Sequence, residues 1–257
     1  MRLKGTWRRM LWKYWYPYVT RLTKDASLIF LNYGYIDDIS INLQTADEAN
    51  RLYIQLYHHV VRAINLTGLD VMEVSCGHGG GASYVTRYLH PKTMLGVDRN
   101  PNAIKFCRNH HAVRGLSFVQ GDAEALQFDD HSFDAIINVE ASHCYGNMSQ
   151  FLEEVTRLLR PGGYFLFADF RTQAGYIILS DQLMQSGLKI IKKENITPNV
   201  LQAMETDDQA KRHLIQQLVP GILHKPAARF AGVKGSNIFN GFESGKMIYL
   251  SYVLRKP

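Results

Sequence analysis

The chain has 257 residues, of which 46% are hydrophobic and 20% are charged, the proportions of a globular protein with a sizeable core. No apolar stretch reaches the roughly 18–20 residues that span a bilayer. The three cysteines, Cys76, Cys107 and Cys144, are too widely spaced for a disulfide framework or a metal site. These features exclude a membrane-spanning chain and a disulfide-rich secreted domain, and they predict a cytoplasmic protein.

The net charge of +6 is concentrated at the N-terminus. Residues 1–25 hold seven of the 29 lysines and arginines, one of the 23 acidic residues and all three tryptophans, so the remainder is electrically neutral. A basic, aromatic segment is typical of a helix on an anionic membrane surface, but it also suits a lid helix, and both interpretations stay open. The neutral body carries no DNA- or RNA-reading motif, which argues against a nucleic-acid partner. Nothing in the pattern indicates an oligomeric state.

In chain order, residues 1–65 read as an N-terminal arm with lid helices, and residues 66–257 read as a cofactor-binding domain with a lid insertion at about 197–242. Helices are predicted over 46–64, 82–90, 101–112, 149–160 and 200–218. Strands are predicted at 71–75, 94–98, 116–120, 134–139, 163–168, 187–193 and 247–254. This alternation predicts an α/β fold, a Rossmann-like doubly wound sheet of seven mostly parallel strands with a helical lid.

The first strand of this domain runs into a glycine turn that contains Ser75, Gly77 and Gly79. A turn without side-chain bulk brings a ligand against backbone N–H groups at a helix N-terminus. Asp98 ends the second strand, where a carboxylate suits a pair of ribose hydroxyls. Glu73 precedes the turn, and its charge would repel a pyrophosphate but attract a cationic or amino-bearing ligand. The pattern therefore predicts a nucleotide-type pocket that does not take a dinucleotide.

These residues resemble the first motif of class I S-adenosylmethionine (SAM) methyltransferases, which is matched here by E-x-S-x-G-x-G-x-G from Glu73. The resemblance implies SAM as cofactor and S-adenosylhomocysteine as product. It implies that Asp98, with its neighbour Arg99, lies at the ribose. Asp122 and Ala123, in Gly-Asp-Ala-Glu after the third strand, are similar to the adenine-contacting motif; the alternative for Asp122 is a helix N-cap.

Two further elements fit this resemblance. Asn138, near the end of the fourth strand, is expected to offer hydrogen bonds to the methionyl end of the cofactor. Asn32-Tyr33-Gly34-Tyr35 resembles the N-Y-G-Y element of lipid, sterol and tocopherol methyltransferases, in which tyrosines close over cofactor and substrate. We therefore include Tyr33 among the cofactor-binding residues; the alternative is a turn with packed aromatic rings.

His143 lies just beyond the fourth strand and is the candidate catalytic base, because an ordinary histidine pKa suits proton abstraction near neutral pH. Asp169 ends the fifth strand and is expected to hold the His143 imidazole. The alternatives are a structural histidine, and an Asp169 that caps a helix or pairs with Arg171. No metal is expected: His58-His59 and His110-His111 are adjacent pairs on predicted helices, whose side chains point apart, and only Asp169 and Asn138 offer oxygen ligands.

Most of the chain resembles the phthiotriol and phenolphthiotriol dimycocerosates methyltransferases, with fatty-acid and natural-product O-methyltransferases close by. The matching segments are 14–17, 50–58, 73–82, 140–145, 160–164, 168–169 and 232–245. The chain departs from this family over residues 175–228, part of the predicted lid. The resemblance implies a hydrophobic small-molecule acceptor with a hydroxyl or carboxyl group, such as a lipid, polyketide or terpenoid. Methylation of nitrogen or carbon, or a non-methylating use of the SAM site, are the alternatives.

Overall fold

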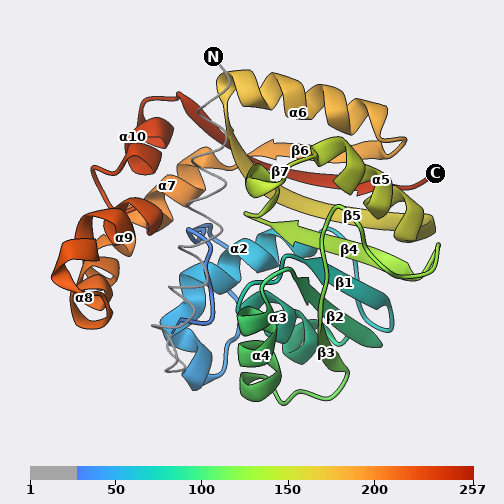
Figure 1. Ribbon diagram of the computed structural model, residues 1–257, viewed down its shortest axis with the longest axis horizontal. Helices are drawn as coiled ribbons and strands as arrows, with labels where there is room; N and C mark the ends of the chain where they lie inside the picture. Colours follow the sequence, from blue (N-terminus) through green and yellow to red (C-terminus); the bar gives the residue numbers. More distant parts are fainter. Residues whose placement is uncertain (1–27) are drawn as a thin grey trace.

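The computed structural model describes residues 28–257, and the predicted basic arm, residues 1–25, lies outside them. Within that range, seven strands form one sheet in the order β3-β2-β1-β4-β5-β7-β6 (Figure 1). The strands are β1 (Asp70–Val74), β2 (Thr93–Asp98), β3 (Leu116–Gln120), β4 (Phe133–Val139), β5 (Leu159–Thr172), β6 (Lys189–Asn195) and β7 (Met247–Arg255). β1 to β5 pair in parallel, and β7 runs antiparallel to β5 and β6. The predicted doubly wound, mostly parallel sheet is confirmed.

Nine α-helices accompany the sheet in the described part of the chain. They are α2 (Arg51–Val61), α3 (Gly80–Leu89), α4 (Pro101–His110), α5 (Met148–Leu158), α6 (Gln173–Gln185), α7 (Thr197–Thr206), α8 (Asp208–Leu218), α9 (His224–Phe230) and α10 (Asn237–Glu243). Because neighbouring strand residues point to opposite faces, Ile137 packs in the core beside α2, α3 and α4, whereas Ile136 packs in the core beside α5 and α6. None of the described helices is long and apolar enough to cross a bilayer.

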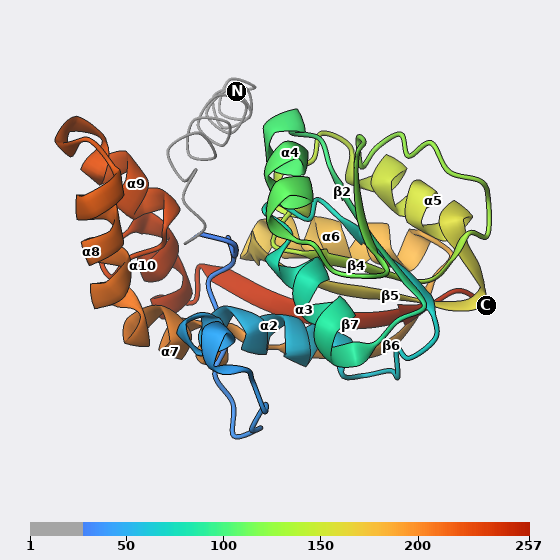
Figure 2. The same ribbon diagram turned by 90° about the horizontal axis from the view of Figure 1, so that it is seen from below.

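The chain leaves β1 toward β2 on one side and later returns to place β4 on the other side. In an open parallel sheet, such a reversal opens a crevice beyond the carboxyl ends of the two central strands. α8, α9 and α10 lie together to one side of the sheet in both ribbon views (Figures 1 and 2). α7 is joined to the segment before α2 by a hydrogen bond of 2.8 Å from Asn199 Nδ2 to the Ile36 carbonyl oxygen. The topology therefore places the site next to the elements expected to form a lid.

The predicted helix over 200–218 is wrong in one respect, because Asp207 divides it into α7 and α8. The Asp207 carboxylate accepts a 2.5 Å hydrogen bond from the Tyr53 hydroxyl and lies 3.3 Å from the Lys211 ammonium group. These contacts hold Asp207 at φ −92°, ψ −3°, outside ideal helical geometry. Tyr53 is 154 residues away along the chain, so helical periodicity could not indicate the break.

Smaller differences concern element ends. The predicted helix over 46–64 begins as a 3₁₀ turn at Thr45–Asn50 and continues as α2. β5 begins at Leu159, earlier than expected, because Leu159 already pairs with Phe133 of β4. The glycine-containing stretch after residue 218 holds the short helices α9 and α10. By contrast, α4 begins as expected, with Pro101 in its first turn and the Asn100 side chain accepting a hydrogen bond from the Asn102 N–H.

Candidate active site

A cavity of about 610 Å³ lies at the carboxyl ends of β1, β2 and β4, and is called here the main cavity. Its volume falls within the range of roughly 300–1,000 Å³ that is usual for ligand sites. Eight of the twelve residues predicted to bind cofactor or act in catalysis line it: Tyr33, Ser75, Gly77, Asp98, Arg99, Asp122, Ala123 and His143. The other four predicted residues are not among the described residues of its wall: Glu73, Gly79, Asn138 and Asp169.

The glycine turn after β1 combines left-handed backbone with close packing. Ser75, Gly77 and Gly79 have φ values of +60°, +57° and +79°. A Cβ atom on Gly79 would lie 2.8 Å from the Phe118 ring, so this glycine is required by packing and backbone conformation together. α3 starts after Gly79 without a side-chain cap. In its first turn the Gly80 N–H donates to the Ile29 carbonyl oxygen at 3.2 Å, and the Ala82 N–H donates to the Glu73 carboxylate.

The structure differs from expectation at Glu73, which lies within β1 and is 1% exposed. Its carboxylate accepts a hydrogen bond of 2.6 Å from the Tyr57 hydroxyl. Burial raises the pKa of Glu73 to about 8 in spite of this bond. The Glu73 side chain is thus held by α2, behind the turn, whereas Tyr57 itself reaches the cavity wall.

Asp98 joins the end of β2 to the glycine turn. Its Oδ2 accepts a hydrogen bond from the Gly77 N–H at 3.0 Å, and its Oδ1 accepts one from the Asn100 N–H at 2.8 Å. Burial raises the pKa of Asp98 to about 6, although both bonds favour the ionised form. The carboxylate is therefore fixed by main-chain groups at the position where a ribose was expected.

Asp122 follows β3 in a tight turn. Its carboxylate accepts a hydrogen bond from the Glu124 N–H at 3.1 Å and lies 3.7 Å from Arg99 Nε. The described backbone between residues 121 and 132 contains no helix, so the alternative of a helix N-cap is not met. Asp122, Ala123 and Arg99 all lie on the wall of the main cavity, on the same side as Asp98.

Asn138 is completely buried between β1 and β4. Its Nδ2 donates to the Val74 carbonyl oxygen at 2.9 Å and is 2.8 Å from the Tyr145 hydroxyl. That hydroxyl lies 2.7 Å from the Ser75 hydroxyl. Asn138 therefore positions Ser75 and Tyr145, which line the cavity, and does not line it itself.

The predicted histidine–aspartate pair is formed. His143, in a 3₁₀ turn at Ser142–Cys144, places Nδ1 2.8 Å from Asp169 Oδ1, and its backbone N–H donates to Asp169 Oδ2 at 2.9 Å. Asp169 also accepts a hydrogen bond from the Ser142 hydroxyl at 2.6 Å and lies 3.0 Å from Arg171. The alternative that Asp169 pairs with Arg171 is therefore also met, because Asp169 contacts both Arg171 and His143.

The charges of this cluster change the protonation of His143. Burial is the largest single influence on its pKa and lowers it, but Asp169 and Cys144 together outweigh burial and raise the pKa to about 10. Burial likewise acts to raise the pKa of Asp169, yet the positive charges of Arg171 and His143 hold it well below its usual range. His143 is therefore mainly protonated near neutral pH, which corrects the expectation of an ordinary histidine pKa.

Glu140, which the sequence reasoning missed, connects three distant segments at the cavity wall. It has φ +49°, an uncommon value for a glutamate, and its carboxylate Oε1 accepts hydrogen bonds from the Tyr33 N–H and the Tyr249 hydroxyl, both at 2.9 Å. Burial raises the pKa of Glu140 to about 7. An acidic residue directly after an apolar strand, three residues before His143, was the available signal.

Tyr33 is placed by its own motif as well as by Glu140. The Asn32 side chain accepts a hydrogen bond from the Gly34 N–H at 2.9 Å, which holds the turn. The Tyr33 ring lies 5.6 Å from the ring of Phe170, and the His143 ring lies 4.3 Å from the same phenylalanine. Tyr33 therefore lies in a turn with packed aromatic rings and also lines the main cavity.

Within residues 28–257, no group of three or more His, Cys, Asp or Glu side chains is arranged to hold a metal ion, and the absence of a metal stays a prediction.

The strand order, the glycine turn and the carboxylate at the end of β2 together define the class of Rossmann-like methyltransferases. A family model described as a methyltransferase domain matches residues 72–167. The chain is 42% identical over 254 residues to the phthiotriol/phenolphthiotriol dimycocerosates methyltransferase of Mycobacterium tuberculosis, which covers 98% of this chain and 94% of that protein. The chain therefore belongs to the family of these methyltransferases.

Two further comparisons extend this result. A fatty-acid O-methyltransferase of Mycolicibacterium smegmatis is 44% identical over 210 residues, covering 81% of this chain and 77% of that protein. The crystal structure of geranyl diphosphate C-methyltransferase from Streptomyces coelicolor A3(2), in complex with Mg²⁺, geranyl diphosphate and S-adenosyl-L-homocysteine, shares the fold. Its TM-score is 0.69 at 14% identity, over 97% of this chain and 98% of that one. The predicted cofactor, S-adenosylmethionine, is confirmed, and the chain is a methyltransferase.

Proposed function

We propose that this enzyme methylates an oxygen atom of a lipid-like acceptor that carries a hydroxyl or carboxyl group. The observation that carries the proposal is the 2.8 Å contact between His143 Nδ1 and Asp169 Oδ1 at the wall of the main cavity. A buried imidazole fixed by a carboxylate can handle the acceptor's proton or charge. The names of two relatives, one a fatty-acid O-methyltransferase, support an apolar acceptor.

The residues of the main cavity fit SAM. Asp98 would hold the ribose hydroxyls, and Asp122 with the Ala123 N–H would hold the adenine. The turn at Ser75–Gly77, which has no side-chain bulk at Gly77, and the Ser75 hydroxyl would lie against the methionyl end. When bound, this cofactor supplies a methyl group that is already activated on a sulfonium. The protein must then align the acceptor oxygen at about 3–3.5 Å and exclude water.

A hydroxyl acceptor requires His143 in its neutral form. Asp169 binds Nδ1 and so fixes which ring nitrogen exchanges a proton with the acceptor, namely Nε2. The same carboxylate raises the pKa of His143 to about 10, so only a small part of the enzyme carries a neutral imidazole at pH 7. The base is strong when it is neutral, but it is in this form mainly at higher pH.

A carboxyl acceptor would use the other protonation state. A fatty-acid carboxylate is ionised at neutral pH and needs no base, and the protonated His143 can donate a hydrogen bond to it. The raised pKa of His143 is the specific observation that favours this second version of the proposal.

Labelled SAM tests the proposal directly. The enzyme is incubated with methyl-labelled SAM and an organic extract of lipids, and the labelled products are identified by mass spectrometry. We expect an O-methylated apolar product, and a fall in turnover of roughly 10²–10⁴-fold in His143→Ala, with SAM binding retained. His213→Ala, an exposed histidine on α8, is the matched control. A methylated amine or carbon product, or undiminished turnover in His143→Ala, would overturn the proposal.

The pH profile separates the two acceptor types. With a hydroxyl acceptor, kcat/KM rises as pH approaches about 10, because the neutral form of His143 accumulates, and Asp169→Asn moves the inflection to lower pH, because burial then acts without the opposing carboxylate charge. With a carboxylate acceptor, kcat/KM is highest near neutral pH and falls as His143 loses its proton. A flat profile from pH 6 to 10 for both acceptors would remove His143 from the reaction.

A further inference from the structure

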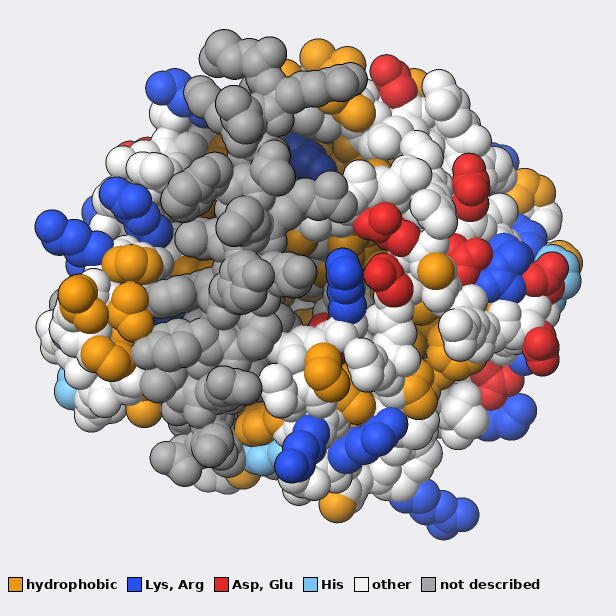
Figure 3. Space-filling view, in the orientation of Figure 1, with side chains coloured by type: hydrophobic (Ala, Val, Ile, Leu, Met, Phe, Trp, Pro, Cys, Tyr) orange, Lys and Arg blue, Asp and Glu red, His pale blue; other side chains and the backbone are white. Residues whose placement is uncertain are grey.

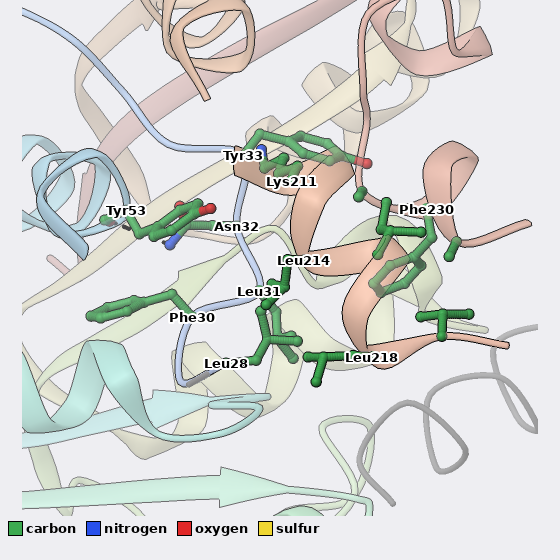
Figure 4. A pocket seen from close by; sticks show the side chains of 14 residues that line it. Leu28, Phe30, Leu31, Asn32, Tyr33, Tyr53, Lys211, Leu214, Leu218 and Phe230 are labelled. Atoms are coloured by element: carbon green, nitrogen blue, oxygen red, sulfur yellow. Dashed lines mark hydrogen bonds between the residues drawn. The ribbon is translucent and has the colours of Figure 1, made fainter. Parts of the chain in front are cut away.

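A second cavity, called here the chain pocket, lies beside the main cavity. It has a volume of about 110 Å³ and is bounded by the segment before α2 and by α8 and α9 (Figure 4). Most of its described wall is aliphatic, including Leu28, Leu31, Leu214, Leu218, Val219 and Ala227. Such a wall binds hydrocarbon by removing apolar surface from water.

The chain pocket adjoins the main cavity, because Phe30, Leu31, Asn32, Tyr33 and Phe230 line both. These residues come from two segments far apart in sequence, the 28–33 segment and the end of α9. A ligand that fills both spaces therefore passes alongside Tyr33. Since the rings of Tyr33 and His143 both pack against Phe170, this passage leads toward His143.

The chain pocket is polar at one end only. Figure 4 shows Asn32, Tyr33, Tyr53 and Lys211 grouped at one end, and the labelled leucines at the other. Lys211 is 9% exposed, and its ammonium group lies 5.8 Å and 5.6 Å from the ring centroids of Tyr33 and Tyr53. Its countercharge is Asp207, at 3.3 Å. A pocket with this polarity suits an amphiphile rather than a uniformly apolar molecule.

Apolar side chains continue to the surface on the outer side of the same helices. Ile222, in the turn between α8 and α9, is 89% exposed. Figure 3 shows hydrophobic side chains grouped on this flank of the molecule, over α8 and α9. A hydrocarbon chain that extends beyond a pocket of about 110 Å³ would thus remain next to apolar surface.

We propose that the chain pocket binds the aliphatic chain of the acceptor, with the acceptor's oxygen-bearing end directed past Tyr33 and Lys211 toward His143. The identity of the occupant as the acceptor rests on the proposed function, but the binding of an aliphatic chain does not. In this arrangement α8 and α9 select for an acceptor with a long alkyl chain. The main cavity, in turn, holds the cofactor and the reacting group.

Binding of cis-parinaric acid, a fluorescent long-chain fatty acid, tests this arrangement without any methyl transfer. The double variant Leu214→Phe/Leu218→Phe adds bulk to the aliphatic end of the chain pocket. Its matched control is Gln209→Phe/Gln216→Phe, which adds the same rings to exposed positions of the same helix. We expect the Kd of cis-parinaric acid to rise about tenfold or more in the leucine variant and to stay unchanged in the control.

SAM affinity, measured by calorimetry, reports that both variants are folded and is expected to match that of the unmodified enzyme. Equal Kd values for cis-parinaric acid in the leucine variant and the unmodified enzyme would overturn the inference. Loss of cis-parinaric acid binding in the leucine variant would support the inference even if no extract yielded a methylated lipid. That combination of results would refute the proposed function alone.

Discussion

Two carboxylates at the main cavity, Asp98 on the cofactor side and Glu140 on the acceptor side, are held in different ways, the first by main-chain groups close to it in sequence and the second by groups from distant segments. Asp98 binds the N–H groups of Gly77 and Asn100, all within two consecutive strand ends. Glu140, in contrast, joins Tyr33 and Tyr249, which lie 107 and 109 residues from it along the chain.

The difference between Asp98 and Glu140 predicts how substitutions near each of them will act. Contacts with backbone N–H groups in short turns can be specified by a local motif, so the position of Asp98 depends little on distant segments. The acceptor side changes whenever one of its distant segments changes. Variants on the two sides are therefore expected to have separate effects, on SAM affinity and on turnover, and the following experiments test that separation from the largest expected effect to the smallest.

Asp169→Asn is expected to lower kcat by roughly 10³-fold, because an amide no longer fixes the tautomer and charge of His143. The Kd of SAM is expected to stay unchanged, since Asp169 is not among the described residues of the cavity wall. Steady-state kinetics and calorimetry measure the two quantities. Asp181→Asn, on the exposed side of α6, is the control. A parallel loss of SAM affinity would show that the two sides are coupled.

Asp98→Asn is expected to weaken SAM binding by about 100-fold, because hydrogen bonds to a charged group are worth about 1.5–3 kcal/mol each. One of the two N–H groups that Asp98 now satisfies would also lose its acceptor. At saturating SAM, kcat is expected to recover. The exposed Asp129→Asn serves as control, and an unchanged SAM affinity in Asp98→Asn would contradict the assignment of the cofactor side.

Gly81→Ala tests packing between α3 and α2. An added Cβ would lie 2.0 Å from the Tyr57 ring, so the helices must separate, at a cost of about 2 kcal/mol or more in the free energy of unfolding. Urea denaturation measures the change. Gly221→Ala, where an added Cβ meets open space, is expected to stay within about 0.5 kcal/mol of the unmodified protein. Equal stability of the two variants would mean that α2 is not packed as described.

Tyr249→Phe is expected to have the smallest effect, about 1 kcal/mol of stability, because Glu140 loses one of its two hydrogen bonds. The pKa of Glu140 is expected to rise further, since that bond favours the ionised form. Tyr252→Phe on the same strand is the control, because the Tyr252 hydroxyl has no hydrogen-bond partner among the described residues. We expect the Kd of SAM to be unchanged in both variants, and a weaker SAM affinity in Tyr249→Phe alone would show that the acceptor side and the cofactor side are coupled.

The same contrast explains what could be predicted from the sequence. The seven strands, the glycine turn and the position of Asp98 follow from local hydrophobic runs and from residue types at strand ends. The His143–Asp169 contact was also predictable, because β4 and β5 are neighbours in this sheet, His143 follows β4 and Asp169 lies near the end of β5. Each of these inferences needed only short-range pattern and the topology of the fold class.

Other features depended on contacts that no local pattern records. Gly79 was attributed to ligand binding as part of a glycine motif, yet an added Cβ at this position would meet the Phe118 ring. Glu73 was expected in the pocket, but the hydroxyl of Tyr57 holds it behind the turn. The raised pKa of His143 arises from the adjacent Asp169 carboxylate and is opposed by burial, and residue spacing does not reveal this balance.

One feature of the sheet bears on how this fold can diversify. β7 lies between β5 and β6 and pairs with both, so the segment from 196 to 246 leaves and re-enters the sheet on adjacent strands. The entropic cost of closing a loop grows only with the logarithm of its length. This segment, which contains α7 to α10, can therefore change in length at little entropic cost, whereas Val200, Met204 and Phe239, which pack in the same core as the sheet, limit changes in its sequence.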